Sequence, residues 1–234
     1  VGGTSAGATA AALVAHGRPM AEMDPVIRHE LARQNPFGDL AVPRQAFSKG
    51  RRIRAALDAL FGEEDLETAT RPLYVVSCDL DAGHAVVHRR GRTADAVAAS
   101  LSIPGLAPPA RLLGSRLVDG GLLNNLPVDV MLEQAEGPII AVDVMRHLPT
   151  QEDGIGPRDQ RSSIVSTLTR AMMLGSHTRS LRNRDLADVV ISPEVSDIGL
   201  LDFDRYDDAV AAGRTATLEV LGAIEGLGVR TASG

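Results

Sequence analysis

The chain has 234 residues, of which 44% are hydrophobic and 23% charged, and its formal net charge is −6. This composition is that of a folded globular protein rather than a disordered or membrane-spanning chain. No apolar run reaches the roughly 18 residues that a transmembrane helix needs, and the negative charge argues against nucleic acid as the main partner. The length suits one α/β domain, and we expect residues 1–234 to form it.

Helix signals recur along the chain. Residues 6–15 are rich in alanine and are followed by Gly17 and Pro19, which predicts a helix directly after a turn. Caps and breakers bound the other helices: Asp24 before Pro25, Ser48, Thr93 and Pro127 at starts, and Gly62 at an end. The predicted helices cover residues 6–15, 25–34, 49–60, 94–99, 127–134, 162–186 and 206–224.

Apolar runs rich in β-branched residues predict the strands. Residues 73–78 form a nearly continuous apolar run, typical of a strand buried on both faces. Residues 84–88 follow a turn and predict its hairpin partner. Further strands are expected at 112–118, 138–144 and 189–191, and 138–144 is the clearest buried one. Because strands alternate with helices, the pattern predicts a layered α/β fold with a mostly parallel central sheet flanked by helices.

A possible nucleophile stands at the start of the chain. Gly3-Thr4-Ser5-Ala6-Gly7 has the G-x-S-x-G spacing of a turn in which a strand leads into a helix and exposes a serine. Gly3 and Gly7 would let the chain turn without side-chain clashes, and the backbone N–H of Ala6 is the natural oxyanion donor. The pentapeptide alone is common, and the alanine-rich helix behind it strengthens the interpretation.

Serine needs a base, and the sequence leaves the choice open. A triad would use a histidine after Ser5, but His147 falls at the edge of a polar loop and His177 inside a long predicted helix. Asp119 ends a predicted strand and precedes Gly120-Gly121, a setting that presents a carboxylate at a strand end or simply forms a turn. Asp143, at the end of another strand, is the competing acid.

Three motifs in order resemble the patatin-like phospholipase family. They are Gly3-Thr4-Ser5-Ala6-Gly7-Ala8, Ser102-Ile103-Pro104-Gly105 and the run from Asp119 to Asp129, DGGLLNNLPVD. Shorter phrases resemble the neuropathy-target-esterase-like bacterial branch of that family: Asn35-Pro36-Phe37, Arg51-Arg52, Val86-Val87-His88 and the strand 140–144. The similarity covers residues 1–144 strongly and the rest loosely.

The resemblance implies a serine esterase or lipid acyl hydrolase, of lysophospholipase or phospholipase type, that uses a Ser-Asp dyad without histidine. Ser5 would be the nucleophile and Asp119 the base, and the reaction would pass through an acyl-enzyme. Gly120, Gly121 and Asn125 would shape the site, and neither a metal ion nor another cofactor is expected. Two alternatives stay open: a conventional α/β-hydrolase triad of Ser5, Asp119 or Asp143, and His177, and an inactive lipid-binding or regulatory module.

The resemblance also bears on the rest of the protein. Family members carry a glycine-rich stretch before the serine that supplies oxyanion donors, and because nothing precedes Val1 here, we expect the domain to lack that segment. A cyclic-nucleotide-binding region is expected upstream in the full-length protein. Phospholipid, lysophospholipid or another fatty acyl ester is the expected substrate. Transient membrane-surface contact and a location in the cytoplasm or at the inner face of the membrane are expected with it.

Overall fold

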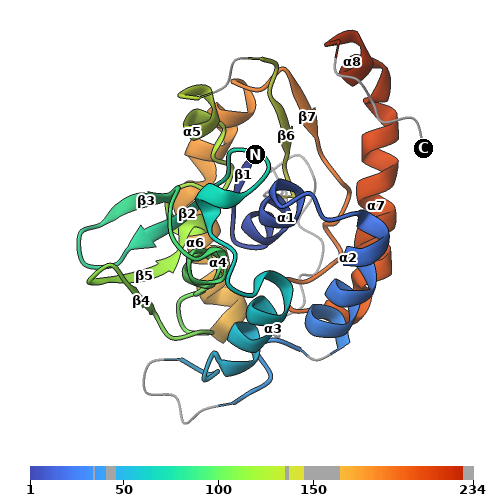
Figure 1. Cartoon of the computed structure of the whole chain (residues 1–234). Coiled ribbons are helices and arrows are strands. Elements are labelled where there is room, and N and C mark those ends of the chain that lie inside the picture. The colour runs from blue at the N-terminus through green and yellow to red at the C-terminus, as the bar shows by residue number, and fades with distance from the viewer. Residues whose placement is uncertain (34, 41–45, 135–136, 145–163, 229–234) are drawn as a thin grey trace.

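The structure is a computed structural model that describes residues 1–33, 35–40, 46–134, 137–144 and 164–228. A sheet forms its centre, and helices pack on the faces of that sheet (Figure 1). The five strands of this sheet are β1 (Gly2–Thr4), β2 (Tyr74–Asp79), β3 (His84–His88), β4 (Ala110–Leu112) and β5 (Ser115–Asp119). The layered α/β architecture expected from the sequence is confirmed.

Three strands share the two edges of β2. On one edge β3 pairs antiparallel with β2 from Val75 to Asp79. The other edge is divided, because β1 runs parallel along residues 74–76 and β5 runs antiparallel along residues 77–79. Since β1 and β5 approach each other head-on beside β2, their carboxyl ends meet at one point. This junction brings together segments more than 100 residues apart in the sequence.

The expected mostly parallel sheet is wrong in its strand directions, since the sheet is mixed. β2 joins β3 through the short turn of residues 80–83, and β4 joins β5 through Leu113-Gly114. Connections this short can link only antiparallel strands. The long connection from β1 to β2 allows the parallel pair. The short turns therefore make the pairs β2–β3 and β4–β5 antiparallel, whereas the alternation of strands and helices favoured parallel pairs.

A second sheet consists of β6 (Ile140–Val142) and β7 (Val189–Ile191), which pair in parallel. The sequence predicted the clearest buried strand of the chain here, and this is wrong for one of its two faces. Ala141 is buried, whereas Ile140 is 36% and Val142 54% exposed. One face of β6 therefore packs against the protein, and the other is open in the described part of the chain.

The helices largely follow the predicted positions. They are α1 (Ala6–Ala15), α2 (Met20–Ile27), α3 (Arg51–Phe61), α4 (Thr93–Ser100), α5 (Val128–Leu132), α6 (Ile164–Arg184), α7 (Tyr206–Glu219) and α8 (Leu221–Gly226). The second helix starts earlier than expected because Pro19 accepts its first backbone hydrogen bonds, so Pro25 lies inside α2 and Asp24 is no cap. Predicted features at 41–45 and 145–163, including the polar loop, lie outside the described residues.

The main core lies between β2 and helices α1, α3 and α4. The predicted apolar stripe of α3 is buried there, with Leu57 fully covered, and Gly62 ends the helix at a φ of 53°. Alanines dominate the buried face of α1, so α1 can approach the sheet closely. In the described residues no helix is both long and apolar enough to cross a membrane.

Candidate active site

Ser5 and Asp119 meet at the junction of β1 and β5. Thr4 pairs with Val76 and Asp119 pairs with Ser77, the next residue of β2. Ser5 follows Thr4 directly, so its side chain reaches the end of β5. The Ser5 Oγ donates a hydrogen bond to Asp119 Oδ2 at 2.6 Å. Two residues that the sequence pattern could only nominate separately are therefore in direct contact.

Ser5 occupies a sharp turn between β1 and α1. Its backbone has φ 56° and ψ −127°, a region that non-glycine residues rarely enter and that costs on the order of 1–3 kcal/mol. Gly3 is required beside it, because a Cβ there would lie 2.4 Å from the carbonyl oxygen of Gly7. Gly7 itself has open space around it, so the steric need expected for both glycines applies to Gly3 alone.

The first turn of α1 faces outward beside Ser5. Ala6 and Gly7 are both exposed. The first N–H groups of a helix have no acceptor within that helix, and they carry the positive end of its dipole. This arrangement suits an anion that forms next to the Ser5 hydroxyl, as the sequence predicted for Ala6.

The Asp119 carboxylate is fully buried. Its Oδ2 accepts the Ser5 hydrogen bond, and its Oδ1 accepts one from the backbone N–H of Gly121 at 2.7 Å. Burial raises the pKa of Asp119 to about 6, although both hydrogen bonds act in the opposite direction by stabilising the anion. The carboxylate is thus a stronger base than an exposed aspartate and is still ionised at neutral pH.

The segment after Asp119 is closely packed. A Cβ on Gly120 would lie 2.4 Å from the carbonyl oxygen of Val76, which explains a glycine at that position. A Cβ on Gly121 would meet Asn125 Oδ1 and Asp119 Oδ1 at 3.0 Å each. The predicted site-shaping residues Gly120, Gly121 and Asn125 therefore lie around the carboxylate.

Neither His177 nor Asp143, the further residues considered for a triad, joins this pair. Both Asp119 oxygens are occupied by Ser5 and Gly121, so no histidine stands between serine and acid. His177 lies on α6, and its Nδ1 has no hydrogen-bond partner among the described residues. Asp143 forms an ion pair with Arg184 beside the second sheet. His147 lies outside the described residues.

Several polar residues at the site escaped the sequence interpretation. The Ser100 hydroxyl accepts a hydrogen bond from the Ser5 N–H at 2.7 Å and donates one to the carbonyl of Val76 at 2.6 Å. The Thr4 hydroxyl donates to the carbonyl of Asn124 at 2.8 Å. A serine near a helix end is common, so no local pattern could have identified Ser100. Only the fold brings it to the nucleophile turn.

Asn124 links the site to α6. Its amide donates to Asp129 Oδ1 at 2.8 Å, and Asn183 of α6 donates to the same oxygen at 2.9 Å and to the carbonyl of Leu126 at 2.7 Å. Arg179 closes the group through an ion pair with Asp129 at 2.7 Å. This network holds the segment that follows Asp119 against the helix.

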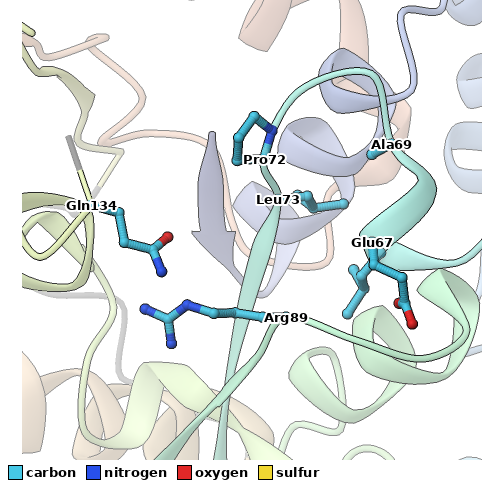
Figure 2. A pocket seen from close by; sticks show the side chains of 7 residues that line it. Glu67, Ala69, Pro72, Leu73, Arg89 and Gln134 are labelled. Carbon is cyan, nitrogen blue, oxygen red and sulfur yellow. The ribbon is translucent and has the colours of Figure 1, made fainter. Parts of the chain in front are cut away.

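A separate surface hollow of about 340 Å³ lies elsewhere on the molecule. Figure 2 shows Arg89 and Gln134 on one side of it, and Pro72, Leu73 and Glu67 across from them. Neither Ser5 nor Asp119 lines it. Among the described residues, no group of three or more His, Cys, Asp or Glu side chains could hold a metal ion.

Comparison with known proteins identifies relatives of this chain. The patatin-like phospholipase family profile matches residues 1–132, which include both Ser5 and Asp119. An uncharacterized NTE family protein of Mycobacterium tuberculosis strain H37Rv is 36% identical over 94% of this chain and 41% of its own length. The chain thus spans about two fifths of that relative.

Two further relatives match a shorter part of the chain. The lysophospholipase nte1 of Aspergillus niger is 31% identical over 62% of this chain and 10% of its own length. Patatin-like phospholipase domain-containing protein 6 of Homo sapiens is 31% identical over 62% of this chain and 11% of its own length. The family match over more than half of the sequence shows that this chain belongs to the patatin-like phospholipase family.

Proposed function

We propose that the protein is a serine esterase that hydrolyses fatty acyl esters of lipids with Ser5 as nucleophile and Asp119 as base. The observation that carries this proposal is the 2.6 Å hydrogen bond from the Ser5 hydroxyl to a carboxylate that is fully buried. A serine hydroxyl is a weak nucleophile unless a base accepts its proton during attack. Asp119 is the group in position to do so.

The proposed reaction has two halves. As Ser5 Oγ attacks the acyl carbonyl, its proton passes to Asp119 Oδ2, and the alcohol leaves with that proton to give an acyl-enzyme. Water then attacks the acyl carbonyl while Asp119 accepts one of its protons. That proton returns to Ser5 Oγ as the fatty acid is released. The raised pKa of Asp119 supports this role, because a base with a pKa nearer to neutral accepts a proton more readily.

The oxyanion requires donors that are free when the reaction begins. The Ser5 N–H is already bonded to Ser100, so it is directed away from the reacting carbonyl. We assign the donor role to the N–H of Ala6, at the exposed start of α1. Loss of one such donor typically costs about 2.7–4 kcal/mol of transition-state stabilisation.

Lysophospholipid is the substrate class to test first. The Aspergillus relative is named a lysophospholipase, and the family is named for phospholipase activity. A lysophospholipid, which has one acyl chain, is also more soluble in water than a diacyl phospholipid. Of the two alternatives from the sequence, the Ser-His-Asp triad finds no histidine between Ser5 and Asp119, and the inactive lipid-binding module is the one left for the experiment.

Contact with a membrane surface would accompany such a substrate. Leu113, at the turn between β4 and β5, is 86% exposed and has a φ of 54°, which leucine adopts at a cost. Arg111 and Arg116 face each other directly behind it, and Arg116 forms an ion pair with Asp81. An exposed leucine in front of the exposed Arg111 fits an anionic lipid surface, and we propose that this turn makes the contact.

Hydrolysis of a lysophospholipid by the full-length gene product tests the proposal. Ser5→Ala and Asp119→Ala should each reduce kcat at least 1,000-fold. Removal of the nucleophile or of its base from a serine hydrolase lowers kcat by at least this factor. His177→Ala should keep kcat within about twofold of the unsubstituted protein. Loss of activity in a folded His177→Ala protein would favour the triad. Absence of activity in every folded form would favour the binding module.

A further inference from the structure

Ser100 occupies a position from which it can control the nucleophile. We infer that Ser100 is a positioning residue that fixes the backbone of Ser5, and that the segment Ser100 to Ser102 sets the separation of Ser5 and Asp119. The inference rests on the proposed function, because it assigns a role in the same reaction. It concerns a residue that neither touches the substrate nor takes part in proton transfer.

The two hydrogen bonds of Ser100 have only one possible direction. An amide N–H can only donate, so the Ser100 oxygen must accept from Ser5 at 2.7 Å. A carbonyl can only accept, so the Ser100 proton must go to Val76 at 2.6 Å. Ser100 itself has no exposed surface. A single buried hydroxyl therefore joins the end of α4 to the nucleophile turn and to β2, with no freedom to rotate.

The same segment also holds the acid. The backbone N–H of Asp119 donates to the carbonyl of Ser102 at 2.9 Å. The Ser100 hydroxyl thus holds the main chain of Ser5, and the Ser102 carbonyl holds the main chain of Asp119. The side chains of Ser5 and Asp119 then meet at 2.6 Å. Because one short segment contacts both partners, a shift of either partner relative to it would change the distance between them.

The backbone conformation of Ser5 gives Ser100 its importance. At φ 56° and ψ −127° this residue is strained and would relax if nothing held it. Relaxation would turn the Ser5 side chain away from Asp119. The bond to Ser100 opposes that movement and also keeps the Ser5 N–H inside the protein, away from the oxyanion.

Ser48 provides a matched control for stability. It is 2% exposed, its hydroxyl donates to Asp39, and its oxygen accepts from the N–H of Gly50 at 2.9 Å. It therefore has the same pattern of one donated and one accepted hydrogen bond as Ser100. Ser48 lies before α3 and contacts neither Ser5 nor Asp119 in the described structure. Ser48 donates to a carboxylate and Ser100 to a neutral carbonyl, so Ser48→Ala should lose at least as much stability as Ser100→Ala.

The experiment measures kcat, KM and amide hydrogen exchange at Ser5 in the full-length protein and its Ser100→Ala and Ser48→Ala variants. We expect Ser100→Ala to lower kcat 10- to 100-fold with KM unchanged within threefold, and to speed exchange at the Ser5 amide at least tenfold. Ser48→Ala should lose at least as much Tm as Ser100→Ala and keep full kcat. If Ser100→Ala does not fold, Ser100→Cys, which keeps the size of the side chain, is measured in the same way.

Two results would overturn the inference. One is a folded Ser100 variant with kcat within threefold of the unsubstituted protein and unchanged exchange at Ser5. The other is an equal loss of kcat in Ser48→Ala, which would show a general effect of stability. A protein that hydrolyses no ester contradicts the proposed function instead. The exchange rate at Ser5 would still test the role of Ser100 in that case, so the two failures are distinguishable.

Discussion

The buried carboxylate of Asp119 favours the proposed chemistry but lowers the stability of the folded protein. Its pKa rises from 3.8 to about 6 on folding because the carboxylate is buried, so the folded protein binds this proton more tightly than the unfolded chain does. The ionised form therefore lowers the free energy of unfolding. This cost is absent below about pH 4, grows between pH 4 and 6, and is complete above pH 6. A buried carboxylate that lowers stability at neutral pH is typical of a functional site, which supports the role of Asp119 as a base.

Asp119→Asn should therefore stabilise the protein while it abolishes hydrolysis. The amide keeps an oxygen for the Gly121 N–H and places a donor toward Ser5, but it removes the buried charge. We expect a gain of about 2–3 kcal/mol in the free energy of unfolding at pH 8, which falls to roughly half at pH 5 and vanishes below pH 4. Thermal denaturation at these pH values measures it. A variant less stable than the unsubstituted protein at pH 8 would argue against the raised pKa.

At the scale of elements, the close approach of β1 and α1 depends on Gly3. A Cβ at Gly3 would overlap the backbone of Gly7, whereas a Cβ at Gly7 meets nothing within 4 Å. Gly3→Ala should destabilise the protein by about 1–3 kcal/mol, since backbone must shift. Gly7→Ala should be neutral or stabilising by up to about 1 kcal/mol, because alanine favours a helix. Denaturant titration compares them, and equal losses would show that the turn is packed differently.

The turn between β4 and β5 allows the membrane proposal to be separated from folding. Leu113→Asn should raise stability slightly, because asparagine before glycine suits the positive φ found here. It should also weaken binding to vesicles that contain anionic lipid about tenfold, because burial of a leucine side chain contributes about 1.5–3 kcal/mol to the binding free energy. Vesicle sedimentation measures the binding.

Leu218→Asn is the control for that experiment. Leu218 is 55% exposed on α7, which lies across the molecule from β4 and β5 (Figure 1). This variant should bind vesicles as the unsubstituted protein does. Equal binding by all three proteins would contradict the assignment of the membrane contact to Leu113.

For the whole molecule, local signals predicted the elements better than their arrangement. Breakers and apolar spacing located most helices within a few residues, but none of the predicted caps Asp24, Ser48 and Thr93 is the N-cap of its helix. Strand direction depends on which segments pair, and the pattern of apolar residues does not encode that choice. The exposure of β6 was missed for the same reason, since burial depends on what packs against each face.

The site was predictable to the extent that its residues belong to motifs. Ser5 and Asp119 stand in a G-x-S-x-G turn and before two glycines, and the resemblance paired them. Ser100 has no motif of its own, because its role arises only where α4 ends beside the junction of β1 and β5. Residues that act through the backbone of another residue become visible only in three dimensions.

The central claim is that Ser5 is a nucleophile activated by Asp119, and covalent labelling tests it most directly. A fluorophosphonate probe, followed by peptide mass spectrometry, should modify Ser5 in the folded full-length protein. In Asp119→Asn the labelling rate should fall at least 100-fold, while His177→Ala should label at the unsubstituted rate. Ser5 left unmodified in the folded protein, or labelled equally fast in Asp119→Asn, would contradict the account.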